Sequence, residues 1–64
     1  MNQVEAIKSL IEITGLLRNR LKELRLMEQS APEDMNKEIE QLIYDVEKAI
    51  SKVEQRLSQF VGIA

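Results

Sequence analysis

An unbroken heptad of apolar residues in the second half of the chain constrains the fold more than any other feature. Its members follow one another at alternating intervals of four and three residues: Ile39, Ile43, Val46, Ile50, Val53, Leu57 and Phe60. This spacing places them all on one face of an α-helix, as the seam along which helices pack lengthwise. We therefore expect a long helix from about residue 31 to residue 61.

A second amphipathic stretch predicts a helix over about residues 2–28. Asn2 is a suitable N-cap, because its side chain can accept a hydrogen bond from the backbone of Glu5 three residues later. Thr14 interrupts the apolar face, and its hydroxyl is expected to bond to a carbonyl one turn earlier. Gly15 costs about 1 kcal/mol relative to Ala in a helix interior. It is either a tolerated surface glycine or a point where a partner helix crosses closely.

The connection between the two stretches is short and carries a helix-start signal. We expect a turn at residues 29–31, with Ser30 as the N-cap of the second helix and Glu33 bonding back to it in a capping box. Pro32 then falls in the first turn, where its missing N–H costs nothing. At the far end, Gly62 is a suitable residue to end the helix, with Ile63 as the hydrophobic partner of a Schellman turn.

A short connection makes the two helices antiparallel neighbours. The sequence thus predicts an all-α fold, an antiparallel two-helix hairpin of coiled-coil type, as a single domain over residues 1–64. An alignment that sets Ile7 opposite Val53 and Leu21 opposite Ile39 makes four of the five layers apolar on both sides. The residues expected in this hairpin seam are Ile7, Leu10, Leu17, Leu21, Leu24, Ile39, Ile43, Val46, Ile50 and Val53.

The chain has more apolar residues than one hairpin seam can use. A single seam takes two positions in seven, whereas a wider stripe suits a bundle of at least four helices. Beside or beyond the seam lie Ile13, Leu16, Met27, Leu42, Ala49, Leu57 and Phe60. A chain of 64 residues with no cysteine cannot add a disulfide to its small core, so further burial requires association. We expect a homodimer that forms a four-helix bundle, or an open face that receives a helix of another protein. Phe60 in particular either ends a dimer-covered helix or belongs to an exposed tail that docks on a target.

The charged residues give little sign of nucleic-acid binding. The net charge is −2, and the basic run Arg18, Arg20, Lys22 and Arg25 is short. This run could grip phosphate, but it also suits a solvated face that complements the acidic start of the second helix. That start holds Glu33, Asp34, Glu38 and Glu40, whose spacing matches no calcium loop. Without histidine, a di-iron bundle is excluded as well, so we expect no metal and no cofactor.

Catalytic residues are not apparent. The serines have no histidine to activate them, and carboxylates on a helix face lack the enclosed pocket that acid–base catalysis needs. Tyr44, just beside the seam, is expected to be a packing or interface residue. No segment reaches the 18 or so apolar residues of a membrane span, and residues 1–10 lack the core of a signal peptide. We therefore expect a non-enzymatic cytoplasmic protein.

The segment Asn36-Lys37-Glu38-Ile39-Glu40 resembles in part the small sporulation-regulator aspartyl-phosphate phosphatases. Those are two-helix hairpins with a Ser-Gln-Glu-Leu-Asp signature on the second helix. Only Glu38 is identical, while Asn36 stands for the serine and Glu40 for the aspartate on which the motif depends. The resemblance implies removal of a phosphoryl group from a response regulator as one alternative function, without assigning the chain to the family.

The leading interpretation is a small interaction module that binds or inhibits another protein through an apolar helical face. Adaptors, antirepressors and accessory regulators of bacteria and phages share this architecture, which is an analogy from fold alone. A nucleic-acid accessory protein that uses the basic face from Arg18 to Arg25 is a further alternative.

Overall fold

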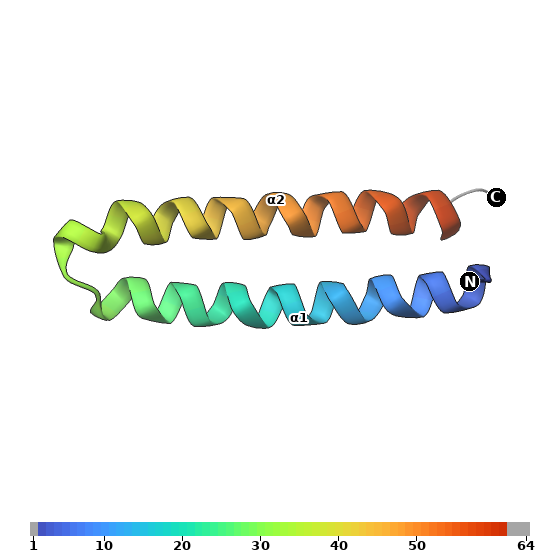
Figure 1. The fold of residues 1–64 in the computed structure, drawn as a ribbon, viewed down its shortest axis with the longest axis horizontal. Coiled ribbons are helices and arrows are strands. Elements are labelled where there is room, and N and C mark those ends of the chain that lie inside the picture. The colour runs from blue at the N-terminus through green and yellow to red at the C-terminus, as the bar shows by residue number, and fades with distance from the viewer. Residues whose placement is uncertain (1, 62–64) are drawn as a thin grey trace.

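Two long antiparallel helices form the structure, a computed structural model that describes residues 2–61 (Figure 1). Helix α1 spans Gln3–Ser30, a 3₁₀ turn η1 spans Glu33–Met35, and helix α2 spans Asn36–Val61. The two long helices lie side by side over their whole length, in a slender body of 47 × 17 × 15 Å. The predicted all-helical hairpin is confirmed.

The start of α1 follows from its N-cap. Asn2 is extended, and its side-chain oxygen accepts a hydrogen bond from the backbone N–H of Glu5 at 2.8 Å. This bond satisfies one of the donors that a helix start leaves without a partner. Further along, the Thr14 hydroxyl donates to the carbonyl of Leu10 at 2.9 Å. Both hydrogen bonds were predicted from the sequence and are confirmed.

The turn differs from the prediction. Ser30 is the last residue of α1, and its hydroxyl donates to the carbonyl of Met27 at 3.5 Å, so the predicted capping box with Glu33 is wrong. The cause is Pro32, which disfavours helical geometry in the residue before it. Ala31 is accordingly extended, with ψ of 148°, and this separates Ser30 from the next helix.

The second helix consequently begins later than expected. Pro32 is also extended, and its carbonyl accepts the N–H of Met35 at 2.9 Å to form the 3₁₀ turn. The regular helix starts at Asn36 instead of at about residue 31, while α1 continues past residue 28 to Ser30. Gly62 and Ile63, the predicted Schellman residues, lie outside the described residues.

The core is a single thin seam. Ile39 and Ile50 are the most buried side chains of the described residues, at 3% and 6% exposure. The other eight residues predicted for the hairpin seam are half-buried, and so are Thr14, Leu57 and Phe60. A two-helix contact can cover each seam residue on one side only, because within residues 2–61 no further long helix closes over it.

The alignment of the two helices can be read from an ion pair. Arg18 Nη2 lies 3.0 Å from Glu54 Oε2. In the predicted alignment, Arg18 would lie level with Leu42, twelve residues before Glu54, or about 18 Å away along the helix axis. That distance is beyond the reach of the two side chains, so the predicted alignment is wrong.

The observed alignment is displaced by one heptad. Arg25 and Glu47 form the equivalent pair at 3.6 Å, seven residues nearer the loop on each helix. At the open end, Gln3 Nε2 donates to the carbonyl of Phe60 at 3.5 Å. These contacts place Ile7 about level with Phe60, whereas we had expected it opposite residue 53. The end of α2 thus packs beside the first turns of α1 and does not extend past them.

Neither helix, within residues 2–61, contains an 18-residue stretch apolar enough to cross a lipid bilayer.

Candidate protein-interaction surface

The hairpin exposes more large apolar side chains than it buries. Two apolar residues are buried in the described part of the chain, whereas nine large ones are exposed. The exposed residues are Val4, Ile11, Ile13, Leu16, Leu26, Met27, Met35, Leu42 and Tyr44. Single exposed apolar residues are ordinary, but a concentration of them on one side marks an interaction surface. The distribution of these residues around the hairpin therefore shows whether they form an interaction surface.

One flank of the seam is bridged by ion pairs, and the exposed Ile11 and Tyr44 also lie on it. Arg18 and Arg25 each follow a seam residue of α1 directly, and Glu47 and Glu54 each follow a seam residue of α2. The Arg18–Glu54 and Arg25–Glu47 pairs show that these positions of the two helices meet on the same side. All four side chains are at least half exposed, so each pair contributes only tenths of a kcal/mol to stability.

The opposite flank carries four of the nine exposed large apolar side chains of residues 2–61. It contains the residues that come directly before a seam residue, among them Ile13 and Met27 on α1 and Leu42 and Ala49 on α2. Leu16 lies three residues after Ile13 and is therefore its neighbour on the helix surface. We refer to Ile13, Leu16, Met27, Leu42 and Ala49 as the apolar flank.

The exposures within the apolar flank show how much of it is open. Leu16 is 66% exposed, Met27 51%, Leu42 49% and Ile13 42%. Ala49 is half-buried between them. The four large side chains are thus covered on one side by the hairpin and open on the other, as in a helical bundle that lacks its second layer.

Two residues expected on this face belong to the seam. Leu57 and Phe60 are half-buried, because the one-heptad displacement brings them beside α1. They lie at seam positions and not on the flank. The sequence missed Val4 and Leu26 as exposed apolar residues, at 67% and 64%. Both lie off the apolar flank, where nothing in the heptad pattern distinguishes them.

The predicted basic patch is divided between the two flanks. Arg18, Lys22 and Arg25 gather around Leu21. Arg20 comes directly before a seam residue, on the side of the apolar flank, where it pairs with Glu23 at 2.9 Å. Arg25 pairs with the middle of α2 and Arg18 with a residue nearer its end. Neither pairs with the acidic start of α2, as the sequence had suggested. Three of the four cations thus have a carboxylate partner, which weakens any phosphate-binding field.

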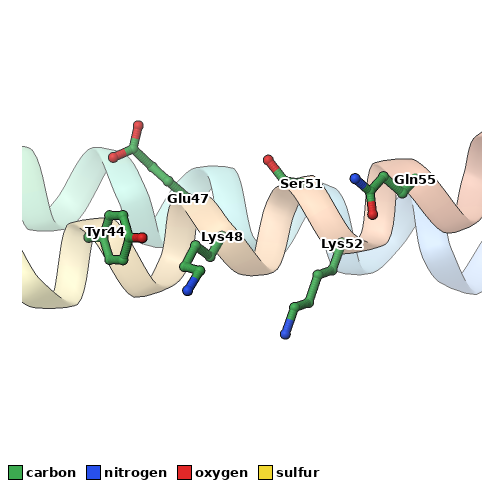
Figure 2. A pocket seen from close by; sticks show the side chains of 6 residues that line it. All are labelled: Tyr44, Glu47, Lys48, Ser51, Lys52 and Gln55. Atoms are coloured by element: carbon green, nitrogen blue, oxygen red, sulfur yellow. The ribbon is translucent and has the colours of Figure 1, made fainter.

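A shallow hollow on α2 offers no chemical site. Its lining consists of Tyr44, Glu47, Lys48, Ser51, Lys52 and Gln55, all from this one helix (Figure 2). Lys48 Nζ lies 5.1 Å from the centre of the Tyr44 ring, a cation–π contact that holds two of these side chains together. A ligand pocket needs walls from more than one side to exclude water, and a single helix does not provide them.

Metal binding finds no support within residues 2–61, where no group of three acidic side chains could hold an ion.

The molecule is thus a two-helix hairpin with one ion-paired flank and one apolar flank. No protein-family profile, no curated protein and no solved structure matches this chain.

Proposed function

We propose that this protein is a small, non-enzymatic interaction module that binds protein partners through its apolar flank. The observation that carries the proposal is the one-sided exposure of Ile13, Leu16, Met27 and Leu42. Burying these side chains on a partner helix would remove apolar area from water, which is the main driving force of protein association. The cytoplasmic location expected from the sequence stays a prediction.

The phosphatase alternative rests on the segment from Asn36 to Glu40 and has little geometric support. Asn36, at the position of the signature serine, is half-buried at the start of α2, and its side-chain oxygen is enclosed without a hydrogen-bond partner. A residue that acts on a phosphoryl group has to reach it, and this oxygen faces the protein. An adaptor or inhibitor requires only the apolar flank, so we prefer the interaction module.

The proposal is tested by substituting the flank and comparing capture of protein partners. Leu16→Lys with Leu42→Lys would place two charges on the apolar flank, whereas Ile11→Lys with Tyr44→Lys places two charges elsewhere. All four positions are at least 49% exposed, so the hairpin tolerates each pair of lysines. Circular dichroism checks that the helices remain.

The readout is association of any kind, measured by light scattering for self-association and by pull-down with mass spectrometry for other proteins. We expect the flank variant to lose association and the control variant to keep it. Equal association by both variants would refute the proposal.

A further inference from the structure

We infer that the partner on the apolar flank is a second copy of this chain, packed flank to flank in the opposite direction about a two-fold axis. This inference rests on the proposed function and specifies the occupant of the same surface. It depends on two patterns along the flank, one of apolar residues on α1 and one of charges on α2. Both patterns place the two-fold axis at about the same position along the length of the hairpin.

The apolar residues of α1 are arranged symmetrically about Arg20. Ile13 and Met27 each lie seven residues from it, about 10 Å along the helix on either side. Turning a second α1 end for end about this point places Ile13 of one copy against Met27 of the other. Arg20 itself is held by Glu23 of its own helix at 2.9 Å, so two such residues meet at the axis as partly neutralised pairs.

The charges beside the flank on α2 are segregated along its length. Glu38 and Asp45 lie in the loop half, and Lys52 and Arg56 lie in the half near the open end. Each of these four residues comes directly before a seam residue, so all four lie on the same side of α2 as Leu42 and Ala49. A second α2 running in the same direction would oppose like charges, which is unfavourable.

Reversing the second α2 removes this conflict. A two-fold rotation about an axis at residue 47 sets Glu38 of one copy against Arg56 of the other. It also brings Asp45 of one copy within three residues of Lys52 of the other. The Arg25–Glu47 ion pair sets residue 47 beside Arg25, whereas the Gln3–Phe60 hydrogen bond, followed along both helices, sets it beside Leu16. Between these two contacts, residue 47 lies about level with Arg20, the centre found independently on α1. Ala49, close to the same height, is small enough for the two α2 helices to approach closely.

Disulfide trapping tests the direction, since the chain contains no cysteine of its own. Two variants, Ile13→Cys and Met27→Cys, are prepared separately and mixed under mild oxidation. We expect a disulfide-linked dimer from the mixture and little from either variant alone, because each like pair lies about 21 Å apart along the axis. Ile11→Cys with Arg25→Cys is the matched control, since it has the same separation on the opposite flank, and should not cross-link.

Sedimentation of the wild-type chain separates this inference from the proposed function. A dimer with the mixed disulfide supports both. A wild-type monomer whose flank still captures another protein overturns the second copy and leaves the interaction module. A dimer that cross-links through Ile13→Cys alone overturns the antiparallel direction.

A charge exchange provides an independent check. Glu38→Arg or Arg56→Glu alone should raise the dimer dissociation constant about tenfold, because two symmetry-related pairs become repulsive. Both substitutions in one chain should restore it to near the wild-type value. Failure of the double variant to recover, with helicity intact, would contradict the pairing.

Discussion

Truncation of Ile39 gives the sharpest test of the seam. Ile39→Ala removes three carbon atoms from the side chain with the lowest exposure, 3%. At about 0.8 kcal/mol per buried methylene, the lost transfer free energy is about 2.4 kcal/mol. Truncations of this kind cost about 2–5 kcal/mol when a cavity remains. The two-helix seam is open at its sides and can partly collapse, so we expect the low end, about 2–3 kcal/mol.

The measurement is thermal unfolding followed by circular dichroism. A loss of 1 kcal/mol lowers the Tm of a domain of this size by about 4–8 °C, so Ile39→Ala should lower it by more than about 8 °C. Leu26→Ala is the matched control, because Leu26 is 64% exposed and its truncation should shift the Tm by only a few degrees. All variants are compared at one protomer concentration, since association raises apparent stability. Equal shifts for Ile39→Ala and Leu26→Ala would refute the assignment of the core.

Three further predictions follow from single features. A Cβ added at Gly15 meets nothing within 4 Å, so Gly15→Ala should raise the free energy of unfolding by up to about 1 kcal/mol without weakening self-association; weaker association would reveal a helix crossing there. Arg18→Glu should destabilise the hairpin by less than about 1 kcal/mol at low salt, and adding Glu54→Arg should recover most of the loss; no recovery would argue against the alignment of the helices. Glu38→Ala with Glu40→Ala tests the phosphatase alternative. If the chain only binds proteins, a response regulator should lose its phosphoryl group at the same rate with this variant as with the wild-type chain. A slower rate with the variant would favour the phosphatase alternative.

The heptad pattern was sufficient to predict the hairpin but not the alignment of its helices. A heptad repeat looks the same after a displacement of seven residues, so apolar layers alone cannot choose between registers. The choice depends on where the chain turns. Residues 31 and 32 are extended because of Pro32, and this displaced the start of α2 to Asn36. A turn estimated a few residues too early was enough to select the wrong heptad.

The same error affected the predicted interaction surface. In the predicted alignment, which is wrong by one heptad, Leu57 and Phe60 lie beyond α1 and are free for a partner. In the structure, both are half-buried in the seam. Ile13, Leu16 and Leu42 could be placed beside the seam from their spacing alone, because a flank position does not change with a seven-residue displacement. The acidic residue that pairs with Arg18 does change with such a displacement, so this partner could be identified only from the structure.

The position of the two chain ends has a consequence for assembly. Gln3 and Phe60 are joined by a hydrogen bond, so both ends of the hairpin lie at the same pole, away from the loop (Figure 1). Anything attached to either end would leave the molecule at that pole. An antiparallel pair would direct two such attachments away from each other, separated by roughly the 47 Å length of one hairpin. The dimer would then act as a rod-shaped spacer that sets the distance between two bound or fused partners.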